Sequence, residues 1–144
     1  MTRIINTIKL NKKIAYLQKL KSLNKESGLI FNSLDNILND FIGHKLFTIL
    51  KFDKINSNLE RVYTSKPREY PLQGKKDVIR NFWQVQVLEK GIAYIGYNFQ
   101  DIKTSFSDFD LIKKLGCSSV LIIPVKSGDN IKGSVNLLHE ESWY

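Results

Sequence analysis

The chain has 144 residues, of which 42% are hydrophobic, and this size and composition are typical of one globular domain with its own core. No apolar run reaches the roughly 18 to 20 residues that cross a bilayer, and the N-terminus lacks the pattern of a signal peptide. We therefore expect a cytoplasmic protein without a membrane span. The lone Cys117 excludes an intramolecular disulfide.

The formal net charge of +8 is concentrated at the N-terminus, where the first 25 residues hold seven basic side chains and no acidic one. Such a segment suits nucleic acid, an anionic lipid surface or an acidic protein. The lysines alternate with apolar residues, however, and neither arginine clusters nor interleaved aromatic residues accompany them. We favour a solvated helix face and expect no nucleic acid partner.

Two amphipathic helices are predicted before the first strand, over residues 10–23 and 27–42, with Asn24 as the N-cap of the second and Gly43 as its end. We divide the chain into an N-terminal helical segment, 1–43, and a domain, 44–144. The domain has room for about one helix pair on its sheet, so part of the apolar stripe is left over. We expect this stripe to hold a homodimer together through Leu10, Ile14, Leu17 and Leu20.

A first hairpin is predicted from residues 46–52 and 59–65, which are rich in β-branched and aromatic residues. Alternation along the second strand places Arg61, Tyr63 and Ser65 on one face. Residues 66–76 contain two prolines and a glycine and are predicted to be irregular.

Two more helices and a short strand follow in the predicted order. Apolar spacing indicates a helix over 77–90 and a strand over 92–96. Ser107 and Asp110 have the spacing of a capping box, which predicts a helix that ends at Gly116.

The last element is a hairpin of residues 116–125 and 131–139, joined by a loop with Gly, Asp and Asn. Its first strand is apolar on both faces, which places it inside a sheet that is covered on both sides. Pro124 and Gly133 indicate a bulge or a close backbone approach near the loop. Together the elements predict an α+β domain with an antiparallel sheet.

These residues also carry a resemblance. The Gly116-Cys117 pair, Pro124-Val125 and the run from Gly133 to His139 resemble the C-terminal hairpin of GAF domains, in particular small single-domain bacterial ones. The likeness covers residues 46–144 and includes these upstream residues: Phe47-Thr48, Arg61 to Tyr63, Tyr70-Pro71, Gly74-Lys75, Trp83, Phe106 and Asp108. It implies a GAF-like (PAS-like) antiparallel sheet of five or six strands with helices on both faces. It also implies a ligand pocket between the sheet and residues 66–115. Ile122 departs from the pattern, where asparagine is common.

The resemblance implies a pocket wall made of aromatic, polar and charged residues. The expected ligand-binding residues are Arg61, Tyr63, Ser65, Tyr70, Lys75, Trp83, Tyr94, Phe106, Asp108, Cys117 and Asn136. Inward-facing charges need partners, and they would suit a small ligand with a carboxylate or phosphate. The alternative is that these charges pair with one another or face solvent, and that the aromatic rings contact only each other.

The sequence offers little support for an enzymatic function. The GAF-type free methionine-R-sulfoxide reductases need a second cysteine, and Cys117 follows a helix C-terminus, where the dipole does not favour a thiolate. His44 and His139 lack metal-site spacing, so we expect no metal and no cofactor. The bilin and cyclic-nucleotide motifs of GAF domains are incomplete here. We therefore predict a non-enzymatic small-molecule sensor or signalling domain, with a redox enzyme or a purely structural interaction module as alternatives.

Overall fold

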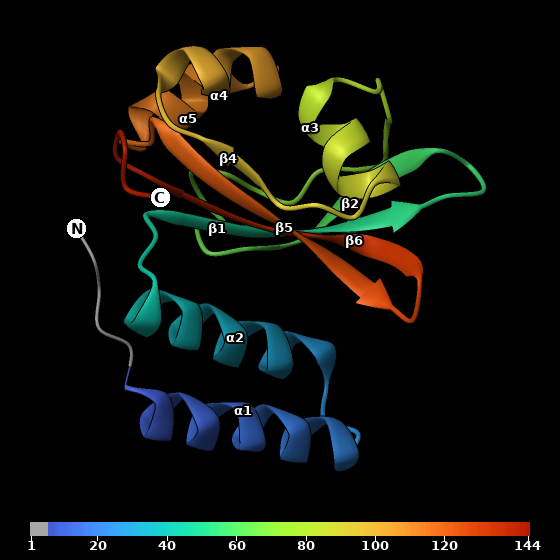
Figure 1. The fold of residues 1–144 in the computed structure, drawn as a ribbon, viewed down its shortest axis with the longest axis vertical. Coiled ribbons are helices and arrows are strands. Elements are labelled where there is room, and N and C mark those ends of the chain that lie inside the picture. Colours follow the sequence, from blue (N-terminus) through green and yellow to red (C-terminus); the bar gives the residue numbers. More distant parts are fainter. Residues whose placement is uncertain (1–5) are drawn as a thin grey trace. The chain divides into compact units, whose positions relative to one another are not determined.

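The computed structural model describes residues 6–144, which form two compact units that divide after His44 (Figure 1). Arg3, one of the seven N-terminal basic residues, lies outside the described residues. No helix within residues 6–144 has the length and apolar character needed to span a membrane.

The first unit is a pair of helices, α1 (Thr7–Ser22) and α2 (Ser27–Phe41). The side chain of Asn6 caps α1 by accepting a hydrogen bond from the backbone of Lys9 at 3.0 Å. Gly43, with φ 91°, ends α2 as predicted. The N-cap prediction for α2 is wrong, because the cap is Glu26, without a side-chain bond. Asn24 instead adopts φ 51° in the turn between the helices, a conformation that asparagine tolerates.

The second unit is built on a six-stranded antiparallel sheet in the order β3-β2-β1-β6-β5-β4, which confirms the predicted fold class. The strands are β1 (Leu46–Asp53), β2 (Asn58–Thr64), β3 (Lys76–Asp77), β4 (Tyr94–Gly96), β5 (Ser119–Ser127) and β6 (Asn130–His139).

Helices cover one face of this sheet. They are α3 (Phe82–Gln84), which continues into a π-helix, η1 (Val85–Glu89), then α4 (Phe99–Ser105) and α5 (Phe109–Lys114). Figure 1 shows α3, α4 and α5 on the same side of the sheet. The core on this face includes Leu46, Val87, Ile102, Ile112, Val120, Ile122 and Leu138.

The β5–β6 hairpin lies inside the sheet, as predicted, because β6 pairs with both β1 and β5. Gly128, with φ 60°, and Asp129 form its loop. The pairing shifts register between Val125 and Lys126, which is the expected bulge. Gly133 supplies the close approach as well, because a Cβ there would overlap the carbonyl oxygen of Leu50 on β1.

The predicted helix over 77–90 starts five residues later. Its first residues are held in the sheet instead, where β3 pairs with β2 and the Val78 amide donates to Ser57 O at 2.9 Å. Asn81 then caps α3 by accepting from the Gln84 amide at 3.1 Å.

The capping box predicted at Ser107 and Asp110 is also wrong, because α5 starts after Asp108 and has no side-chain cap bond. Helix α4 was not predicted at all. A signal for its start is nevertheless in the sequence: the N-cap Asn98 accepts from the Asp101 amide at 3.0 Å, and Asp101 accepts from the amide of Tyr97, the residue before the cap, at 2.8 Å.

Candidate functional site

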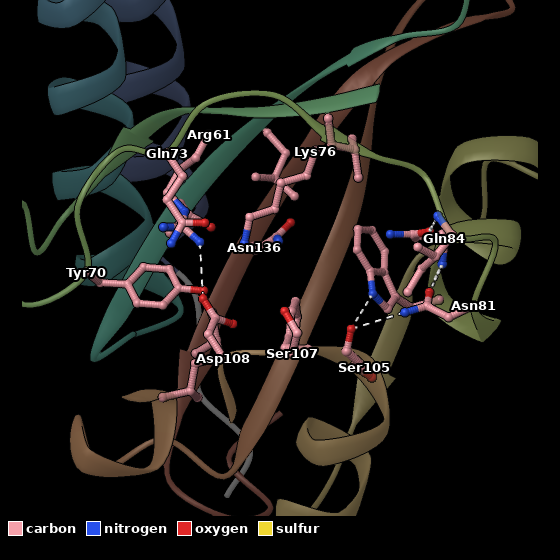
Figure 2. Close-up of a pocket in the computed structure, with 18 of the residues that line it drawn as sticks. Arg61, Tyr70, Gln73, Lys76, Asn81, Gln84, Ser105, Ser107, Asp108 and Asn136 are labelled. Atoms are coloured by element: carbon pink, nitrogen blue, oxygen red, sulfur yellow. Dashed lines mark hydrogen bonds and ion pairs between the residues drawn. The ribbon is translucent and has the colours of Figure 1, made fainter. Parts of the chain in front are cut away.

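A cavity of about 270 Å³ lies in the second unit, between the sheet and the segment that follows β2. Figure 2 shows Arg61 and Tyr70 on one side, Asn81 and Gln84 on the other, and Asn136 between them. The lining residues are Thr48, Leu50, Leu59, Arg61, Tyr70, Gln73, Gly74, Lys76, Asp77, Ile79, Asn81, Trp83, Gln84, Ser105, Phe106, Ser107, Asp108, Ile112, Asn136 and Leu138.

A β-bulge in β2 decides which side chains reach the cavity. Ile49 pairs with Tyr63, but its neighbour Leu50 pairs with Arg61, so Val62 is the extra residue. The bulge cancels the alternation, and Arg61 points into the cavity with Leu50 while Tyr63 shares the opposite face with Ile49. The prediction that Arg61 and Tyr63 share one face is therefore wrong.

Arg61 is the charged centre of the cavity wall, and its side chain is only 9% exposed. Its Nη1 donates to Pro71 O at 2.6 Å, and its guanidinium lies 3.8 Å from the centre of the Tyr70 ring. Its Nη2 faces Asp108 Oδ2 at 3.5 Å. Within the described residues, Arg61 Nε and Asp108 Oδ2 are buried without a hydrogen-bond partner. The ion pair is thus in place, but its hydrogen bonding is incomplete.

Tyr70 lies against the same charge pair. Burial raises the pKa of its phenol far above the ordinary value, the negative charge of Asp108 raises it further, and Arg61 acts in the opposite direction. Tyr70 therefore remains a neutral phenol at any physiological pH and retains a proton that it can donate.

Two buried polar residues form the floor of the cavity. Thr48 on β1 and Asn136 on β6 are cross-strand partners and are 3% and 2% exposed. The Asn136 amide oxygen accepts from Ser134 Oγ at 2.8 Å. Both residues line the cavity, so their side chains can contact a ligand there.

The wall opposite Arg61 is held in place by the backbone of Ser105. Its carbonyl oxygen accepts from Trp83 Nε1 at 3.0 Å and from Asn81 Nδ2 at 3.1 Å. The Trp83 ring packs near Phe106, with centroids 6.0 Å apart. Six of the predicted site residues therefore line one cavity: Arg61, Tyr70, Trp83, Phe106, Asp108 and Asn136.

The other five predicted site residues do not line it. Tyr63 packs on Phe47, with ring centroids 5.8 Å apart, and Ser65 Oγ accepts from the Phe47 amide at 2.9 Å. Lys75 is exposed beside the cavity, and the Tyr94 hydroxyl accepts from Ser105 Oγ at 3.4 Å. The fifth is Cys117.

Cys117 is fully buried in the core. Burial raises the pKa of its thiol to about 11, although Lys45 and Lys66 lower it in part. A thiol in this state is a poor nucleophile at neutral pH. The structure therefore gives no support to a redox reaction at this residue.

Both histidines contact protein side chains outside the cavity lining. His44 Nε2 lies 2.7 Å from Asp35 Oδ1, and His139 stacks on Trp143 at 3.7 Å. Among residues 6–144, no three metal-binding side chains lie together.

The sequence analysis did not identify these polar and charged lining residues: Thr48, Gln73, Lys76, Asp77, Asn81, Gln84, Ser105 and Ser107. One signal was present, because Asn81 and Gln84 have the spacing of a capping box. The Gln84 side chain does not close such a box on the Asn81 amide, because its oxygen accepts instead from the Ile79 amide at 2.9 Å.

No protein-family model matches the chain, and no curated protein does. Solved structures do match. The GAF domain of a phosphoenolpyruvate-protein phosphotransferase from Coxiella burnetii aligns with a TM-score of 0.69 at 10% identity, over 96% of this chain and 82% of its own. A phycocyanobilin-bound GAF domain from a cyanobacterial phytochrome aligns at 0.67 and 14%, over 97% and 83%. The GAF domain of a sensor histidine kinase from Bacillus halodurans aligns at 0.65 and 14%, over 81% and 78%.

The chain therefore has the GAF fold, as its resemblance to GAF domains implied.

Proposed function

We propose that this protein is a non-enzymatic sensory or regulatory domain that holds a small molecule in the cavity and reports its presence to a partner. The observation that carries the proposal is the buried Arg61–Asp108 pair, which lines a cavity and retains unsatisfied hydrogen-bonding atoms. Buried polar groups of this kind are costly unless something satisfies them. The phycocyanobilin-bound phytochrome domain supports the proposal, because it holds a small molecule on the same fold.

We expect the full chain to retain a small molecule through purification, detectable as a mass difference between native and denaturing spectra. Ser107 is exposed and lines the cavity, so Ser107→Trp is expected to block it and abolish the difference. Thr104→Trp is the matched control, because Thr104 is exposed on α4 and does not line the cavity. A molecule retained equally by the Ser107→Trp variant would place the binding site elsewhere.

We also infer that the protein is a homodimer held by its N-terminal helical segment, residues 1–43. Three residues of the expected contact stripe are at least half-buried within the single chain, namely Leu10, Leu17 and Leu20. Ile14 is 42% exposed, and elsewhere on α1 the side chains of Ile8 and Tyr16 are 73% and 49% exposed. A two-fold contact between two copies of the chain is the commonest way to cover exposed apolar residues of this kind.

Sedimentation equilibrium tests the dimer. We expect a dimer for the full chain and a monomer for a shortened chain that starts at Lys25. Ile14→Asp should weaken the dimer, whereas Asn11→Asp adds the same charge to an exposed polar position on α1 and should not. Added salt should favour the dimer, since it screens the lysines over about 10 Å at 0.1 M. A monomeric full chain would reject this arrangement.

A further inference from the structure

We infer that the ligand is a neutral molecule with a hydrogen-bond acceptor next to a donor, as on a primary or cyclic amide. The inference rests on the proposed function, because it concerns the same cavity. It differs from the anionic ligand expected from the sequence. That expectation depended on inward-facing cations, but Lys75 does not line the cavity and Arg61 is paired.

The charges around the cavity balance. Four charged side chains line it, and two are cationic and two anionic: Arg61, Lys76, Asp77 and Asp108. Arg61 and Asp108 form the buried pair, while Lys76 and Asp77 are exposed on β3. An ion that enters the cavity therefore meets no net charge of opposite sign to offset the loss of its hydration.

The buried Arg61–Asp108 pair discriminates between ligands of different charge more strongly than the overall charge balance does. Neither Arg61 Nε nor Asp108 Oδ2 is accessible to water, so a ligand that bonds to both side chains must displace their surroundings, and it does so in our proposal by entering between the two members of the pair. At 3.5 Å the pair has no hydrogen bond between Arg61 Nη2 and Asp108 Oδ2 to break. Separating the two side chains therefore costs less free energy than separating a hydrogen-bonded ion pair.

Each class of ligand leaves this pair in a different state. An anion between the two side chains would pair with Arg61 and leave the Asp108 carboxylate facing a like charge, and a cation would do the reverse. An amide avoids both costs. Its carbonyl oxygen accepts from the Arg61 guanidinium while its N–H donates to the Asp108 carboxylate, so each charge keeps a strong hydrogen bond.

The rest of the cavity suits the same class of ligand. Thr48 and Asn136 offer neutral hydrogen-bonding groups on the floor, and Asn136 lies between the two walls in Figure 2. Trp83 and Phe106 present aromatic surface for the flat body of such a molecule.

Three probes of nearly the same shape test the inference: benzamide, benzoate and benzamidinium. Titration of the full chain at pH 7, followed by the indole N–H resonance of Trp83 in NMR spectra, reports binding in the cavity. We expect benzamide to bind at least about tenfold more tightly than either ion. Asp108→Asn removes the anionic member of the pair, and we expect the preference to shift toward benzoate by about tenfold or more. Arg61→Gln should shift it toward benzamidinium.

The outcomes separate the two claims. Tighter binding of benzoate or benzamidinium to the wild type overturns the neutral ligand and leaves the proposed function intact. If a folded Asp108→Asn variant keeps the wild-type order of affinities for the three probes, the neutral-ligand inference is overturned too, because the charge of Asp108 would then have no effect on which ligand binds. If none of the three probes shifts the Trp83 resonance at millimolar concentration, the cavity is no small-molecule site, and both claims fail.

Discussion

Replacing Gly133 by alanine is expected to lower the free energy of unfolding by about 3 kcal/mol or more. The added Cβ would overlap the carbonyl oxygen of Leu50, and that atom is backbone on a strand paired on both sides. No rotamer change relieves the overlap, so β1 and β6 must separate near the loop end of the hairpin. Urea unfolding followed by tryptophan fluorescence measures the loss.

Gly74→Ala is the matched control in the same unit, because nothing lies within 4 Å of a Cβ at that position. Its stability should stay within about 1 kcal/mol of the wild type, and a small rise is expected from the reduced freedom of the unfolded chain. If Gly133→Ala unfolds at the same urea concentration as Gly74→Ala, the close approach of β1 and β6 is not as described.

The elements that the sequence predicted well are those with a strong local pattern. The β5–β6 hairpin has two long apolar runs around a Gly-Asp turn, and Gly133 in its second strand marked the close approach. The error at α3 came from tertiary pairing. Its start moved because β3 pairs with β2, and a strand of two residues has no local sequence pattern that predicts such pairing.

The cavity residues show the same contrast between what a sequence pattern predicts and what depends on strand pairing. Arg61 and Asp108 were expected because they resemble a family pattern, whereas their mutual pairing depends on the bulge at Val62. The bulge exists only in relation to the partner strand, so alternation along β2 alone placed Tyr63 on the wrong face. Thr48 was overlooked for a related reason: its side chain is ordinary for a strand and becomes part of the site only through its pairing with β6.

The second large effect is expected at the Arg61–Asp108 pair. Arg61→Met leaves the Asp108 carboxylate, 21% exposed, without its counter-charge and should lower the free energy of unfolding by about 3 kcal/mol. Asp108→Leu should cost less, because Arg61 keeps its hydrogen bond to Pro71 O and its contact with the Tyr70 ring. The double variant removes both charges, so we expect it to be more stable than the sum of the single effects predicts, by about 2 kcal/mol.

The Arg80–Glu89 pair provides the contrast, because its geometry is better and its burial is far lower. Arg80 Nε and Nη2 donate to the two Glu89 oxygens at 2.6 and 3.0 Å, yet these side chains are 67% and 45% exposed. When one partner is removed, water can hydrate the charge that remains. Arg80→Met, Glu89→Leu and their double variant should therefore show a much smaller coupling energy than the Arg61–Asp108 set. Urea unfolding of both sets gives the two coupling energies. If Arg61→Met and Asp108→Leu add without coupling, while the exposed pair shows as much coupling or more, the stabilising role assigned to the buried pair is wrong.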